Sequence, residues 1–139
     1  MDKSDWKSYE EWLEILPECV KDDPLWRLEV YRKSLFLSDL AWIDCEKLQN
    51  NPLGQARMSQ LLRSSGSIPA NVEEGYGRGF GKDYARFLRI AIGSARETRG
   101  WYWRNRHALE TKVVDHRMKL STDIIQMFTV IADQQRKRK

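Results

Sequence analysis

Apolar residues recur at helical spacing from Leu25 almost to the end of the chain, and the alternation typical of β-strands is nearly absent. Strong stop signals interrupt this pattern at Asn50, Asn51 and Pro52, and again at a glycine-rich stretch over residues 75–81. We therefore expect amphipathic helices over residues 25–49, 53–68, 82–109 and 112–135. With connections this short, the predicted fold class is all-α, an up-down-up-down four-helix bundle.

The helix expected over residues 25–49 has two apolar faces, whereas packing against a bundle core requires one. Since a helix that is apolar on two faces touches more than its own core, we expect a homo-oligomer. One face carries Leu28, Tyr31, Leu35 and Trp42, and the other carries Leu25, Phe36, Leu40 and Ile43. The predicted subunit interface consists of Tyr31, Leu35 and Trp42.

Pro69 sets the predicted end of the second helix. A proline has no backbone N–H and its ring clashes with the preceding turn, so sequence rules alone end the helix there. We expect the hydroxyls of Ser64, Ser65 and Ser67 to satisfy the carbonyls that are freed.

Charge divides the 139-residue chain, whose length fits one domain. Residues 1–24 hold three lysines and eight acids, a net of 3 − 8 = −5, so the remaining residues carry 4 − (−5) = +9. We predict an acidic extension over 1–24, the bundle over 25–135 and a basic tail over 136–139. Ser8 and Glu11 have capping-box spacing ahead of Trp12, which predicts a short amphipathic helix in the extension. It either packs on a neighbouring molecule or is a solvated arm.

The chain has no apolar run long enough for a membrane span, and its first residues lack the apolar core of a signal peptide. Cys19 and Cys45 have no metal-ligand spacing. We therefore expect a cytoplasmic protein with both cysteines reduced, no metal and no membrane contact.

The third predicted helix carries a row of cations opposite its apolar face. Lys82, Arg86, Arg89 and Arg96 recur with helical spacing, and residues 78–106 hold eight bases against two acids, 8 − 2 = +6. Arginine suits bidentate phosphate contacts, and Trp103 at the border is suited to stacking on an unpaired base. The pattern predicts RNA binding; the alternative is an ordinary solvated face. The candidate RNA-binding residues are Arg78, Lys82, Arg86, Arg89, Arg96, Arg99, Trp103, Arg104 and Arg106.

Catalytic patterns are poor. The loop over residues 76–82 lacks the GK[ST] of a phosphate-binding loop, so a tight turn accounts for it better than a nucleotide site. His107 and His116 flank the last predicted turn without a nucleophile motif, and Glu73 and Glu74 have no nearby His or Cys. We expect no enzyme and no cofactor.

Residues 60–97 resemble the bacterial four-helix-bundle family of 23S rRNA intervening-sequence proteins. The resemblance rests on ordered matches to the family's Ser-Ile-Pro, Glu-Gly and Phe-Leu motifs. The matching residues are Gln60, Leu61, Arg63, Ser67, Ile68, Pro69, Asn71, Glu74, Gly75, Gly77, Arg78, Phe87, Leu88, Ile90, Ala91, Gly93, Ser94 and Glu97. Glu73, residues 100–107 and the acidic extension depart from the family pattern.

The resemblance implies a ring-like homopentamer without known catalysis, in which the second helix continues, kinked, through Pro69. It implies a structural role for Ser67, Pro69, Asn71, Glu74, Gly75 and Gly77. Related bundles are the accessory variability proteins of diversity-generating retroelements, which bind a reverse transcriptase and its template RNA. Whether the rRNA or the retroelement branch applies stays open.

The function that we predict is a non-catalytic, RNA-binding, oligomeric scaffold, with structured or single-stranded RNA and a reverse transcriptase as partners. The alternative is an oligomeric adaptor whose acidic N-terminal segment and exposed tryptophans dock a protein, with no RNA role.

Overall fold

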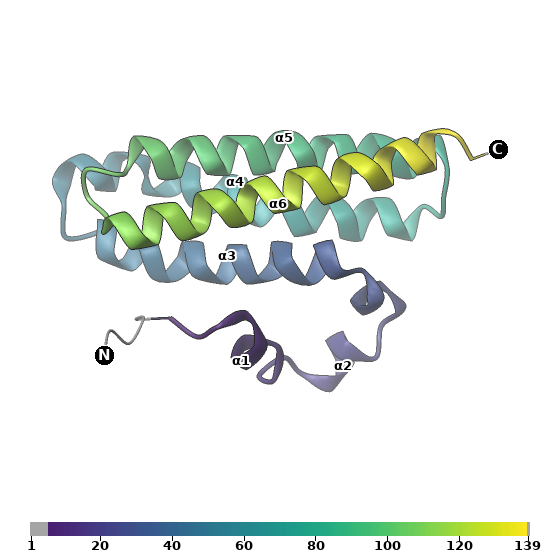
Figure 1. Ribbon diagram of the computed structural model, residues 1–139, viewed down its shortest axis with the longest axis horizontal. Coiled ribbons are helices and arrows are strands. Elements are labelled where there is room, and N and C mark those ends of the chain that lie inside the picture. The colour runs from purple at the N-terminus through teal and green to yellow at the C-terminus, as the bar shows by residue number, and fades with distance from the viewer. Residues whose placement is uncertain (1–5, 139) are drawn as a thin grey trace.

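The computed structural model describes residues 6–138 and is all-helical over that range (Figure 1). Residues 1–5 of the acidic extension and Lys139 of the basic tail lie outside the described residues. The elements are α1 (Tyr9–Leu13), α2 (Glu18–Lys21), the 3₁₀ helix η1 (Pro24–Arg27), α3 (Glu29–Leu48), α4 (Pro52–Gly77), α5 (Lys82–Arg104) and α6 (Thr111–Arg136). The predicted all-α class is therefore confirmed.

The four long helices lie side by side along the longest axis of the molecule (Figure 1). Each of α3, α4 and α5 packs against the helix that follows it in the chain, and α6 also contacts α3. They enclose one continuous apolar core. Its most deeply buried members include Val30, Leu37, Leu48, Leu61, Ile68, Val72, Leu88, Tyr102, Ile124 and Phe128.

The core face of α3 differs from the predicted one. Val30, Leu37 and Leu48 are fully buried, whereas Trp42 is 62% exposed. The helix also begins later than expected, because Leu28 has an extended backbone (φ −83°, ψ 106°) and residues 24–27 form η1. The side chain of Asp23 accepts a hydrogen bond from the Leu25 N–H (2.9 Å) and thus caps η1.

Helix α4 continues through Pro69 to Gly77, as the resemblance implied and against the sequence rule for proline. Ile68, Pro69 and Val72 are all buried, so tertiary packing offsets the lost backbone hydrogen bond. The expected role of the serines is wrong: Ser64 and Ser65 donate to the carbonyls of Leu61 and Leu62, about two turns upstream of the proline, and the Ser67 hydroxyl bonds that of Ser94.

Helix α5 ends at Arg104 and not at Leu109. Asn105 leaves the helical conformation (φ −93°, ψ 8°), and the next backbone hydrogen bond, from the Arg106 N–H to the Trp103 carbonyl (3.2 Å), spans three residues in place of four. The Asn105 side-chain amide adds a second hydrogen bond to the Trp101 carbonyl (2.9 Å), which already accepts one from the Asn105 N–H. At the other end, Gly79 and Gly81 have φ of +99° and +86°, values that suit glycine and make the turn from α4.

The extension packs on its own bundle, in place of the neighbouring molecule or solvent that we expected. The capping box between Ser8 and Glu11 is present, and α1 buries Trp12 to 4% exposure against Phe36 and Leu40 of α3. The Trp12 indole N–H donates to Asp39 (2.7 Å). The second apolar face of α3 is thus partly covered within one chain.

Candidate nucleic-acid interface on α5

The outer face of α5 carries the predicted cations, and its inner face is apolar. Lys82, Arg86, Arg89 and Arg96 are exposed, while Leu88 and Ala95 are fully buried. The separation follows from the 3.6-residue helical period, which brings residues spaced by three and four onto one side. We call these four residues the α5 stripe.

Most of the α5 stripe has no acidic partner. Arg86 pairs with Asp83 (3.2 Å), one turn away. Glu97, the acid in the middle of the helix, instead pairs with Arg63 of α4 and accepts a hydrogen bond from the Trp101 indole (3.2 Å). Among residues 6–138, no ion pair joins Lys82, Arg89 or Arg96 to an acid. Their charge is available to an external anion.

Arg78 and Arg99 lie apart from the α5 stripe. Arg78, the C-cap of α4, pairs with Glu74 (3.1 Å) and Asp83 (3.8 Å). Arg99 is half-buried and donates to the Thr122 hydroxyl of α6 (3.1 Å). These two arginines therefore make contacts within the bundle.

The end of α5 holds two pairs of stacked arginine and tryptophan. The Arg104 guanidinium lies 4.7 Å from the centre of the Trp101 ring, and that of Arg106 lies 3.9 Å from the centre of the Trp103 ring. Arg106 also donates to the Trp103 carbonyl (2.9 Å). Trp103 is 52% exposed, so a charged and aromatic surface continues the α5 stripe toward the turn before α6.

Behind the α5 stripe, family-motif residues join α4 to α5. The Asn71 amide donates to the Ser67 carbonyl (2.8 Å) and hydroxyl (3.0 Å), and the Ser67 hydroxyl bonds the hydroxyl of Ser94 (2.9 Å). Gly75 allows close approach, because a Cβ there would lie 2.6 Å from that of Phe87. These contacts hold α5 at a fixed position on α4.

Two of the three predicted subunit-interface residues are covered within the chain. Tyr31 is 6% exposed and donates to Glu73 (2.6 Å); burial, and then this carboxylate, raise the pKa of Tyr31. Leu35 packs partly buried against the core, which leaves Trp42 exposed. The subunit interface itself stays a prediction, and Trp42 is its one exposed residue.

A buried charged network that was not expected from the sequence joins α3, α5 and α6. Asp44 and Arg117 are both fully buried and joined by two hydrogen bonds, of 2.7 and 3.0 Å, and Tyr102 donates to Asp44 (2.7 Å). Burial first, and the Asp44 charge second, raise the pKa of Tyr102 well above its ordinary value. The sequence does contain a signal for this network. Asp44 lies among apolar residues on the buried face of α3, and Arg117 lies among apolar residues on the buried face of α6.

The two histidines have separate surroundings. His116 is half-buried, contacts the Trp6 ring (5.1 Å between centres) and shares a hydrogen bond with Arg117 (2.8 Å); burial lowers its pKa. His107 is exposed. No group of three or more His, Cys, Asp or Glu in residues 6–138 is placed to hold a metal ion, and no helix in that range could cross a bilayer.

Comparison with known proteins identifies the family. The model of the 23S rRNA-intervening sequence protein family matches residues 27–130, which is more than half of the chain. The chain belongs to this family. The match covers α3, α4, α5 and most of α6, and leaves out α1 and α2.

One solved structure is similar to the structure of this chain. It is a protein of unknown function from the S23 ribosomal protein family of Bacteroides thetaiotaomicron VPI-5482. The two share 26% identity with a TM-score of 0.67, over 74% of this chain and 97% of the other. No curated protein matches the sequence.

Proposed function

We propose that this 23S rRNA-intervening sequence family protein is a non-catalytic scaffold that binds RNA through the α5 stripe. One observation carries the proposal: Lys82, Arg89 and Arg96 stand in a row on an exposed helix face without acidic partners among residues 6–138. Anionic polymers bind such rows by releasing counterions from their phosphates.

The dimensions of the α5 stripe suit a run of phosphates. Lys82 and Arg96 are fourteen residues apart, so the helical rise separates them by about 21 Å along the axis. The planar guanidiniums of Arg89 and Arg96 can each hold a phosphate with two hydrogen bonds. Trp103, which is 52% exposed, adds an aromatic surface on which an unpaired base can stack.

We further propose that the long helices form an up-down-up-down protomer of a homo-oligomer, with five subunits as the family resemblance implies. Several copies of the α5 stripe on one assembly would raise the avidity for a long RNA. In the retroelement branch of the resemblance, the protein partner is a reverse transcriptase. Light scattering on the purified chain measures the subunit number directly.

The RNA proposal is tested by fluorescence anisotropy with a labelled structured RNA and a labelled single strand. Arg89→Glu combined with Arg96→Glu removes two cations and adds two acids, and we expect binding to fall at least about tenfold at low salt. The matched control is Arg27→Glu with Lys119→Glu, which makes the same charge change at exposed positions on η1 and α6.

Binding of the wild-type chain should also weaken steeply as salt rises, and the Arg89/Arg96 variant should show a shallower salt dependence. If both double variants lose affinity equally, attraction is a property of net charge and the α5 stripe is not the site. If neither RNA binds at low salt, the proposal is wrong.

A further inference from the structure

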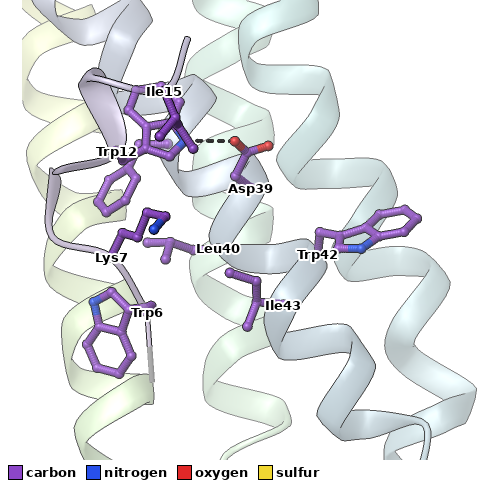
Figure 2. A pocket seen from close by; sticks show the side chains of 9 residues that line it. Trp6, Lys7, Trp12, Ile15, Asp39, Leu40, Trp42 and Ile43 are labelled. Carbon is purple, nitrogen blue, oxygen red and sulfur yellow. Dashed lines mark hydrogen bonds between the residues drawn. The ribbon is translucent and has the colours of Figure 1, made fainter. Parts of the chain in front are cut away.

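A groove opens between the acidic extension and α3, on the opposite side of the bundle from α5 (Figures 1 and 2). Its volume is about 420 Å³. Trp12, Phe36 and Leu40 are buried at its base. Ile15 and Trp42 line it as well, yet they are 59% and 62% exposed. Two large apolar side chains, Ile15 and Trp42, are therefore exposed to solvent at the groove.

The apolar surface continues beyond this groove. On the far side of Trp42, a smaller hollow of about 60 Å³ is lined by Cys45 and Glu46 of α3 and by Met58 and Leu62 of α4. Trp42 lines both the groove and the smaller hollow and therefore lies between them. An extended apolar strip therefore runs from α1 across α3 to α4, long enough for more than one side chain of a ligand.

Acidic residues border this strip. Asp39 and one cation, Lys7, line the groove (Figure 2). Glu46 lines the smaller hollow, and Glu14 directly precedes Ile15. No ion pair within residues 6–138 neutralises Glu14 or Glu46. Residues 6–23 hold two lysines against six acids, a net of 2 − 6 = −4. This charge repels nucleic acid and attracts a cationic protein surface.

We propose that this groove docks a basic amphipathic helix of another protein, which inserts one or two large apolar side chains beside Trp42 and places Lys or Arg near Glu14 and Glu46. Apolar anchors in a groove supply the affinity in this mode of recognition, and the charges select the partner. Since α5 lies across the bundle, the protein could hold this partner and RNA together (Figure 1). The inference does not depend on RNA binding.

The probe is a phage-displayed library of random peptides of about 16 residues, some four helical turns, selected on the immobilised full chain. We expect enriched peptides to combine apolar residues at helical spacing with an excess of Lys and Arg. Synthetic versions are then measured by anisotropy against variants of the full chain.

Trp42→Ala should weaken binding of the selected peptides about 30-fold, as the loss of a central aromatic anchor does. Its matched control is Leu53→Ala, which truncates an apolar side chain that is 82% exposed on α4 outside the groove. Glu14→Gln with Glu46→Gln should weaken binding and reduce its dependence on salt. The control is Asp115→Asn with Asp123→Asn on α6, both exposed.

Failure of the library to yield any specific peptide would overturn the proposal, as would enriched peptides without a cationic excess. Binding that Trp42→Ala leaves unchanged would do the same. Light scattering tests whether a second copy of this chain occupies the groove instead. If the wild-type chain is an oligomer and Trp42→Ala converts it to monomers, a second copy fills the groove and the proposal is wrong.

Discussion

Arg117 lies at the centre of the apolar, buried face of α6. Each nitrogen of its guanidinium group has a partner. Nε and Nη2 donate to Asp44 (2.7 and 3.0 Å), and Nη1 contacts His116 Nδ1 (2.8 Å). The Trp6 ring lies 4.2 Å from the guanidinium carbon. A buried charge is tolerated at this position because every polar atom of the group is satisfied.

Breaking this pair should be costly. Arg117→Met leaves Asp44 buried without its counter-charge, and we expect a loss of about 3–5 kcal/mol in the free energy of unfolding. Adding Asp44→Asn removes the uncompensated charge and keeps an acceptor for Tyr102, so the double variant should be more stable than Arg117→Met. Urea denaturation measures both. A single-variant loss below about 1 kcal/mol would contradict this account.

His116 should make stability depend on pH. Its pKa in the folded chain lies below 6.5, so the unfolded chain binds the extra proton more readily. The stabilisation is complete above pH 6.5 and is lost as the pH falls through the folded-state pKa. His116→Gln should flatten the decline of urea midpoints between about pH 7 and 5. The exposed His107, changed to Gln, is the control and should leave the slope unchanged.

At the scale of the helices, the fit between α4 and α5 positions the α5 stripe. Small residues make that fit possible: Ala91 and Ala95 are fully buried, and Gly75 lies against Phe87. A network of hydroxyls accompanies them, in which Thr98 donates to Ser64 (3.0 Å) and Ser67 bonds Ser94 (2.9 Å). The α5 stripe is therefore carried by a rigid element.

Gly75→Ala should disturb this fit, since the added Cβ would lie 2.6 Å from the Phe87 Cβ and 3.0 Å from the Tyr84 ring. Overpacking of this kind costs about 1–3 kcal/mol. Gly66→Ala is the matched control in α4, where no atom lies within 4 Å of the new Cβ, and it should be neutral or stabilising. Thermal unfolding of both variants checks this; equal melting temperatures would show that α4 and α5 accommodate the added methyl group without loss of packing.

The extension and α3 depend on each other in a similar way. Trp12 is 4% exposed and its indole donates to Asp39 (2.7 Å). Trp12→Ala should cost about 3 kcal/mol or more, because it also uncovers Phe36 and Leu40. Trp12→Phe keeps most of the apolar contact and loses the hydrogen bond, so its cost should be smaller. If both variants unfold at the same urea concentration as the wild type, the extension does not contribute to the stability of the bundle.

Over the whole molecule, charge is separated across the bundle. The acidic extension lies beside α3, and α5 lies across the bundle from it (Figure 1). The α5 stripe is on the exposed face of α5. Since exposed charges more than about 10 Å apart interact strongly only at low salt, the extension should weaken RNA binding modestly.

Neutralising the extension tests this effect without unfolding it. Glu10, Glu14 and Glu18 are exposed, and changing all three to Gln keeps α1 and its buried Trp12. We expect RNA affinity to rise a few-fold at low salt and to equal that of the wild type near physiological salt. An increase that persists at high salt would mean that the extension competes directly with RNA for the α5 stripe.

Local patterns were enough to predict the existence of four long helices, the exposed row of Lys82, Arg89 and Arg96, and the capping box of Ser8, because these depend on residues within a few positions of one another. They did not predict where α3 begins or where α4 and α5 end. Tertiary structure decided the rest. Helix α4 passes Pro69 because neighbouring helices bury that segment, and the Tyr31 hydroxyl is satisfied because Glu73, distant in the sequence, accepts a hydrogen bond from it. The pairing of Asp44 with Arg117 and the packing of Trp12 on α3 likewise join segments whose proximity no local pattern encodes.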